Sequence, residues 1–226
     1  MLRHLLTSAL LAGLAAGLAA TVLQLAFVVP LIIEGELYES GALLHFSATG
    51  SPTSPVTHPD IWAEPARHIG TFAMNLVTWS GFAFILVAAF GLAERAGAKI
   101  SAQSGAIWGL CGFIAVQLAP AMGLPPELPG TIGADLAGRQ LWWMATVAAS
   151  IGGLGLFAFG RGAVAVAAGA LLLLAPHVIG APELDTYFGI APAELSAHYA
   201  ARSLAVGAAT WAILGTVAGA VWSRPA

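Results

Sequence analysis

Histidine and carboxylate side chains are the groups in this sequence most suited to binding a metal ion. The chain has six histidines and eleven acidic residues among its 226, but only one cysteine, Cys111. Imidazole and carboxylate without a thiolate pair suit a borderline divalent cation such as Co²⁺, Ni²⁺ or Zn²⁺. A single cysteine excludes an internal disulfide and a CxxC pair. Cys111 lies mid-way along an apolar run, where packing and metal ligation are the two roles open to it.

Paired carboxylates also carry out general acid–base catalysis. However, no HExxH and no nucleophile–base pair accompanies the carboxylates here. The sequence also has no GxxxxGK[ST] nucleotide loop, and Lys99 is its only lysine. We therefore expect a protein that is not an enzyme, has no resident cofactor, does not hydrolyse ATP itself and has no nucleic-acid partner.

The elements that must position these groups are membrane helices. Hydrophobic residues make up 58% of the chain and charged residues only 8%, against about 25% charged in soluble domains. Several apolar runs reach the roughly 20 residues that cross a bilayer. The sequence predicts an all-α, polytopic integral membrane bundle, a single transmembrane domain over 1–226. Its six helices are expected at about 5–33, 68–92, 102–119, 140–159, 163–179 and 196–222.

The first and fifth helices leave alternatives open. The run 5–33 follows a basic start, as a signal peptide does, but a signal has an apolar core of about 7–15 residues. We expect this longer run to stay as a helix. The fifth helix is short and is expected to be interrupted at Pro176-His177, so five spans result if it is re-entrant.

Charge distribution predicts the orientation. With six spans, one side of the membrane holds five basic residues (Arg3, Arg95, Lys99, Arg161, Arg224) and the other holds three (Arg67, Arg139, Arg202). The positive-inside rule makes the first side cytoplasmic, with both termini there. The external side then holds the loop 34–67 and a Pro-rich cap, 120–139, and the expected location is a bacterial cytoplasmic (inner) membrane.

The acidic residues are distributed very unequally between the two membrane faces in this orientation. Glu94 alone is cytoplasmic, whereas the other ten acidic residues and five of the six histidines lie at the external face. An acidic mouth raises the local concentration of cations. The alternative is that translocated loops simply tolerate acidic residues better than basic ones.

One face of the helix 68–92 is polar. His68, Thr71, Asn75 and Thr78 recur at spacings of three and four, which places them on one side of a helix. Such a stripe is either a seam of interhelical hydrogen bonds or the wall of a polar path through the membrane. As path-lining residues we select Thr71, Asn75 and Thr78.

Glu127 and His177 each have two interpretations. Prolines and a Pro-Gly turn surround Glu127, so its carboxylate is held either for a cation or for an ion pair with Arg139. His177 follows Pro176, and it is either a hydrogen-bonding group at a helix interface or a metal ligand. Glu194, His198 and Arg202 share a helix face, but the nearby cation excludes them from the proposed metal site.

Small residues and tryptophans indicate packing and anchoring. Glycine pairs four residues apart allow close approach of helix backbones; they occur at Gly13/Gly17, Gly105/Gly109 and Gly215/Gly219. Trp142 and Trp143 suit an interfacial aromatic belt, where an apolar ring meets polar headgroups.

Two segments resemble a known family. The string LAPAMGLPPELPG followed by ADLAGRQLWW, and PHVIGAP at 176–182, are similar to the landmarks of the CbtA family, a predicted cobalt transporter subunit. Weaker matches are the exit of the first helix, with Gln24, Pro30, Glu34 and Glu36, and AERAGAKISAQSGAIWGLCGF. The resemblance covers most of the chain.

The resemblance implies cobalt uptake for corrinoid synthesis, with a small single-span, histidine-rich subunit of CbtB type as partner. It carries a metal-binding role onto Glu34, Glu36, Glu127 and His177, to which the polar helix face adds His68. The sequence therefore predicts a permease subunit in the lipid bilayer that captures Co²⁺ or a similar divalent cation at its external acidic and histidine-bearing face. Two alternatives remain, namely a non-transporting assembly subunit, and a haem or electron-transfer protein in which two of His68, His177 and His198 ligate iron.

Overall fold

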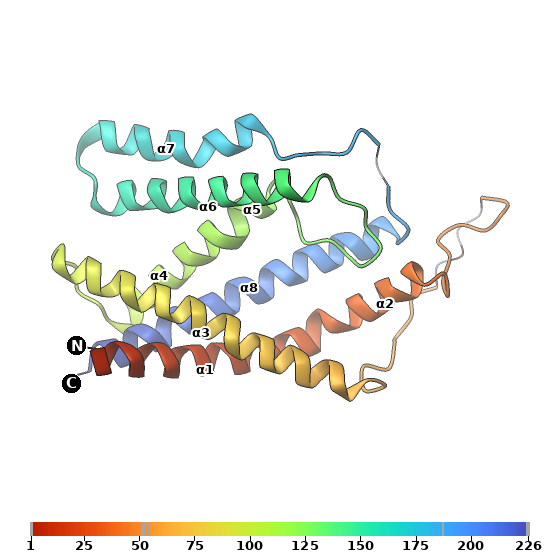
Figure 1. Cartoon of the computed structure of the whole chain (residues 1–226), viewed down its shortest axis with the longest axis horizontal. Helices are drawn as coiled ribbons and strands as arrows, with labels where there is room; N and C mark the ends of the chain where they lie inside the picture. The colour runs from red at the N-terminus through yellow and green to blue at the C-terminus, as the bar shows by residue number, and fades with distance from the viewer. Residues whose placement is uncertain (1, 51–52, 54, 187, 225–226) are drawn as a thin grey trace. The chain divides into compact units, whose positions relative to one another are not determined.

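All the regular elements that the structure describes are helices. The computed structural model describes residues 2–50, 53, 55–186 and 188–224 (Figure 1). In chain order the elements are α1 (Leu2–Phe27), α2 (Val29–Glu39), α3 (Pro65–Arg95), α4 (Ala102–Phe113), the π-helix η1 (Ile114–Leu118), α5 (Ala119–Ala121), α6 (Leu136–Phe159), α7 (Gly162–Ile179) and α8 (Ala193–Trp222).

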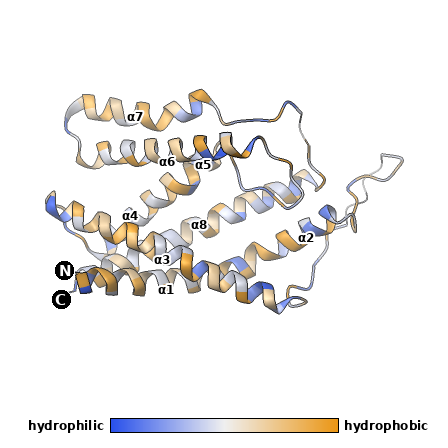
Figure 2. Ribbon diagram, in the orientation of Figure 1, coloured by the Kyte–Doolittle hydropathy of each residue, from blue (hydrophilic) through white to orange (hydrophobic). Residues whose placement is uncertain are grey.

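Six helices are long and apolar enough to cross a membrane. They are α1, α3, the combined segment Ala102–Ala121, α6, α7 and α8. Figure 2 shows hydrophobic residues along these helices and hydrophilic residues mostly at their ends and in the connections. The predicted helical membrane bundle with six spans is thus confirmed.

The chain forms two compact units, each described separately below. Unit 1 comprises Met1–Val29, Asp60–Phe113 and Ala205–Ala226, and unit 2 comprises Pro30–Pro59 and Ile114–Leu204. Three helical segments therefore run from one unit into the other, within α2, at the junction of α4 with η1, and within α8.

Small residues bring the helices of unit 1 together. Helices α1 and α3 run antiparallel and side by side (Figure 1). A Cβ on Gly13 of α1 would lie 2.6 Å from the Ser80 Cα of α3. In α4 a Cβ on Gly109 would overlap the Trp211 carbonyl oxygen of α8, and one on Gly215 would lie 2.8 Å from the Gly109 Cα. The glycine pairs thus serve close helix packing, as predicted.

Unit 2 contains the antiparallel pair α6 and α7 and an apolar cluster formed by residues from three other segments. The cluster comprises Leu31 and Tyr38 from α2, Leu128 from the connection before α6, and Leu195 from the start of α8. Leu31 and Tyr38 are seven residues apart, so they share one face of α2. This cluster fixes the Pro-rich connection that carries Glu127.

The first helical region extends beyond its predicted end. The sequence predicted one helix over about 5–33 and a loop over 34–67, but α2 continues to Glu39 and α3 already begins at Pro65. Pro30 does not stop α2 because it is the second residue of that helix, where a proline's missing N–H has no intrahelical acceptor anyway. Burial of Tyr38 then favours the helix as far as Glu39.

Two local predictions at prolines differ from the structure. Helix α7 is not interrupted at Pro176 but continues to Ile179, because a proline removes a single backbone donor and the packed helix continues past it. The segment 102–121 likewise stays helical through Pro120. Trp142 is buried, and its Nε1–H donates to the Pro176 carbonyl at 3.1 Å. The interfacial position expected for Trp142 and Trp143 stays a prediction.

Candidate functional site

His68 is the best-prepared metal ligand among the predicted residues. It lies in the first turn of α3, which begins at Pro65, and its ring is buried. The Nε2 atom makes a hydrogen bond with the Ile61 backbone carbonyl, and the ring of Trp62 packs edge-on at 5.3 Å. Because a carbonyl only accepts, Nε2 carries the proton, so neutral His68 has its lone pair on Nδ1.

The Nδ1 atom of His68 is buried and has no hydrogen-bond partner among the described residues. In metal sites, a ligating histidine typically donates its other N–H to a backbone carbonyl or carboxylate, which fixes the ring and its tautomer. His68 already has this arrangement through Ile61.

Asn75 joins α3 to α1. Its Nδ2 donates to the Gln24 Oε1 at 2.9 Å and to the Thr21 Oγ1 at 3.2 Å. Thr71, one turn earlier, donates to its own helix at the Arg67 carbonyl, 2.9 Å away. The Asn75 contacts correspond to the hydrogen-bonded seam between helices. From the sequence, Gln24 was named only as part of the family resemblance and was not paired with Asn75.

The polar face of α3 changes exposure along its length. His68 and Asn75 are buried, whereas Thr78 is exposed. Thr78, at the end of the polar stripe, is therefore not in the same buried environment as Asn75. A path-lining role for Thr71, Asn75 and Thr78 stays a prediction.

Glu127 is held in an ion pair in unit 2. Its Oε2 accepts from the Arg139 Nη2 at 2.7 Å, and the two side chains are 32% and 26% exposed. The backbone of Gly133 lies directly against this guanidinium, because a Cβ there would overlap the Arg139 Nη1. The Asp135 carboxylate, which accepts from the Gly138 N–H at 2.9 Å, caps α6 and so fixes the helix that carries Arg139. Of the two interpretations of Glu127, the ion pair is the one present in the structure.

The two acidic residues near the exit of the first helical region lie on α2. Glu34 is half-buried, and its Oε1 accepts from the Thr57 N–H at 3.4 Å. Glu36 is also half-buried. Residues two apart on a helix point in different directions. A metal-binding role for Glu34 and Glu36 stays a prediction.

His177 packs against the tryptophan that ties α6 to α7. Its ring lies edge-on to Trp142 with centroids 6.0 Å apart, and Trp142 in turn donates to the carbonyl of the neighbouring Pro176. His177 is half-buried. The interface role weighed for His177 thus has a structural counterpart, and its metal-binding role stays a prediction.

The predicted ligands belong to different units of the chain. His68 lies in unit 1, whereas Glu34, Glu36, Glu127 and His177 lie in unit 2. Within the described part of the chain, no group of three or more histidine, cysteine or acidic side chains is arranged to hold a metal ion.

A comparison with protein families matches residues 2–223 to the family described as "Probable cobalt transporter subunit (CbtA)". The chain belongs to the CbtA family. No curated protein and no solved structure matches it. The family match extends over both segments, 118–143 and 176–182, on which the resemblance was based, so that resemblance is confirmed.

Membership in the CbtA family places the helices in a functional class. Together with the six apolar helices, it identifies the chain as a multi-pass membrane protein of a transporter-subunit family. The family description is that of a transport component rather than an enzyme, and the word subunit makes a partner chain plausible.

Proposed function

We propose that this CbtA-family chain imports Co²⁺, or a similar divalent cation, across the bacterial cytoplasmic membrane as a permease subunit. The observation that carries the proposal is the family match over residues 2–223 of a chain with six helices long enough to span a bilayer. Both termini face the cytoplasm in this proposal.

The external face attracts the ion. Ten of the eleven carboxylates lie there in the proposed orientation, and their combined field concentrates cations before any ligand is exchanged. The ion then exchanges part of its water shell for protein ligands, and the candidates are His68 in unit 1 and Glu34, Glu36, Glu127 and His177 in unit 2. The free Nδ1 lone pair of His68 supports this role most directly.

The ligands are engaged to different extents before the ion arrives. The Glu127 carboxylate must leave Arg139, and Glu34 gives up the Thr57 N–H, whereas His68 needs no change of tautomer. We therefore expect modest affinity, which suits transport because the site must release its ion. A membrane potential of 100 mV drives a divalent cation inward with about 4.6 kcal/mol.

Cellular uptake of ⁵⁷Co²⁺ tests the proposal. The chain is expressed alone, in excess Mg²⁺, and compared at matched expression with His68→Gln, His177→Gln and the exposed-site control Gln103→Ala. We expect uptake above that of the empty vector, lost in His68→Gln, reduced in His177→Gln and unchanged in Gln103→Ala.

Two other results would redirect the proposal. No uptake by the chain alone, with uptake restored by a co-expressed histidine-rich single-span subunit, would mean that the transport path requires the partner. Uptake that is unaffected by both histidine substitutions would contradict the proposed capture site.

A further inference from the structure

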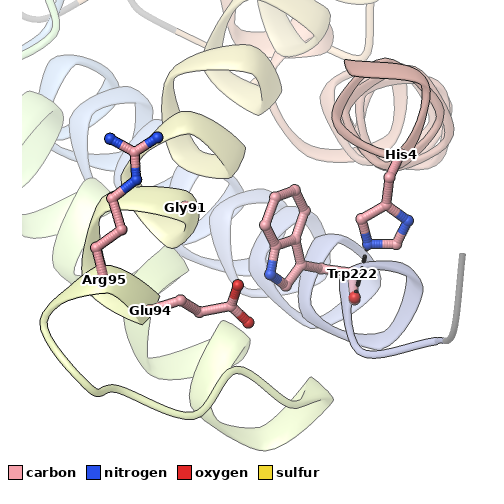
Figure 3. A pocket seen from close by; sticks show the side chains of 5 residues that line it. All are labelled: His4, Gly91, Glu94, Arg95 and Trp222. Atoms are coloured by element: carbon pink, nitrogen blue, oxygen red, sulfur yellow. Dashed lines mark hydrogen bonds between the residues drawn. The ribbon is translucent and has the colours of Figure 1, made fainter. Parts of the chain in front are cut away.

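A cavity of about 400 Å³ lies at one end of unit 1. It is lined by His4, Gly91, Glu94, Arg95 and Trp222 (Figure 3). The cavity lies where α1 begins and where α3 and α8 end. None of its lining residues belongs to the predicted metal site.

The aromatic wall of the cavity is held in place. The His4 Nε2–H donates to the Trp222 carbonyl at 2.8 Å, and the two rings lie 4.8 Å apart. Trp222 is only 8% exposed, and the Phe90 ring packs against its indole with centroids 6.4 Å apart. The indole is therefore a fixed surface rather than a mobile side chain.

The cavity presents one charge of each sign. Glu94 and Arg95 are both exposed, and neither forms a salt bridge or side-chain hydrogen bond with another described residue. In Figure 3 the Glu94 carboxylate points toward Trp222, whereas the Arg95 guanidinium extends away from it. Two separated opposite charges beside an aromatic surface suit a ligand that itself carries a positive and a negative charge.

We propose that this cavity binds a phosphoethanolamine group, supplied by the headgroup of a phospholipid. The primary ammonium donates to Glu94 and lies against the Trp222 indole, where a cation is attracted by the ring. The negative ends of the α3 and α8 dipoles add to this attraction. The Arg95 guanidinium donates to the phosphate, for which its planar fork is well shaped.

The surroundings of the cavity favour a lipid as the source of this group. The cavity is formed by the ends of three membrane-crossing helices, where headgroups lie. Leu2 and Leu6 of α1 and Leu92 of α3, neighbours in sequence of the lining residues, are exposed. These side chains supply an apolar surface for acyl chains next to the charged pocket.

Gly91 allows the cavity to be filled without changing its charges. A Cβ on Gly91 would lie 3.9 Å from the Trp222 indole, which is an ordinary van der Waals contact. Gly91→Ala should therefore be tolerated, whereas the longer side chain of Gly91→Met would extend into the cavity. This pair separates occupation of the cavity from any effect of losing the glycine.

Native mass spectrometry of the delipidated full chain in detergent tests the proposal. The probes are phosphatidylethanolamine, phosphatidylcholine, phosphatidylglycerol and free phosphoethanolamine. We expect phosphatidylethanolamine to bind about fivefold more tightly than phosphatidylcholine, because the quaternary ammonium of phosphatidylcholine cannot donate a hydrogen bond. This factor is at the upper end of what an exposed charge pair contributes. Glu94→Gln should remove this preference, Gly91→Met should abolish binding, and Gly91→Ala and Glu183→Gln should match the wild type.

The other outcomes overturn the proposal. Equal binding of the three lipids, or a preference for phosphatidylglycerol, would contradict an ammonium site. Free phosphoethanolamine that binds as tightly as the lipid would show that the source is a soluble molecule. A Glu94→Gln variant that keeps the wild-type preference would exclude this carboxylate. Helical circular dichroism of each variant, matched to the wild type, shows that a loss of binding is not a loss of fold.

Discussion

Replacing Gly133 with alanine should break the Glu127–Arg139 ion pair while leaving both charges in the protein. An added methyl group would occupy the position of the Arg139 Nη1, which now lies against the Gly133 backbone. The guanidinium is the far end of a flexible side chain, so it is the group that moves. Its 2.7 Å contact with the Glu127 Oε2 is then lost.

The size of the effect follows from the partial burial of the pair. Charges about 4 Å apart attract by about 4 kcal/mol at an effective dielectric constant of 20. Desolvation and lost side-chain entropy offset most of this energy, and about 1 kcal/mol is a reasonable net value for side chains that are 26% and 32% exposed. If Glu127 is a Co²⁺ ligand, removing its competitor should lower the dissociation constant for Co²⁺ about fivefold.

Equilibrium dialysis of ⁵⁷Co²⁺ against the purified protein in lipid nanodiscs measures this constant. Gly189→Ala is the matched control, since a Cβ there would have no neighbour within 4 Å. Arg139→Gln should tighten binding as Gly133→Ala does, and Glu127→Gln should weaken it. If all three variants bind Co²⁺ as the wild type does, Glu127 is not a ligand, and its pair with Arg139 only stabilises the cap.

Three further predictions concern packing and hydrogen bonds, each measured as a shift in thermal unfolding of the detergent-solubilised protein. Gly215→Ala should destabilise by about 1–3 kcal/mol, because its Cβ would force α8 away from α4, whereas Gly81→Ala, with open space around its Cβ, should not. Asn75→Ala should cost about 0.6–1.7 kcal/mol through its lost interhelical hydrogen bonds; a smaller loss would show that the seam contributes little. Trp142→Phe should cost about 1 kcal/mol through loss of the bond to Pro176, and an unchanged midpoint would argue against that bond.

The number and kind of spans could be predicted from sequence because a membrane helix depends mainly on local composition. About 20 apolar residues satisfy both the bilayer thickness and the internal hydrogen bonding of the backbone. The glycine pairs could be predicted for the same reason, since close approach of two helices needs small residues wherever the partner lies. These properties require no knowledge of distant contacts.

The helix ends and the side-chain partners depend on such contacts and could not be predicted in the same way. The extension of α2 to Glu39 follows from Tyr38 packing near Leu128, ninety residues away in sequence. The burial of Trp142 depends on the Pro176 carbonyl of another helix. The sequence showed that Trp142 is amphipathic, but it did not show which part of the protein would cover this side chain.

The choice between a ligand and an ion pair at Glu127 illustrates the same difference. The sequence placed Glu127 and Arg139 in one Pro-rich connection and allowed both interpretations. Only the fold of that connection, with Gly133 under the guanidinium, brings the two charges to 2.7 Å.

The π-helix η1 changes the phase of the third span. Each wider turn of a π-helix accommodates an additional residue, and one residue corresponds to about 100° of rotation in an α-helix. A helical wheel drawn straight through 102–121 therefore assigns the residues beyond Ile114 to the wrong side. Gln117, whose Oε1 is buried without a partner among the described residues, is the polar group whose direction depends on this offset. Deleting a single residue of η1 would act as a rotation of everything that follows rather than as a shortening of the span.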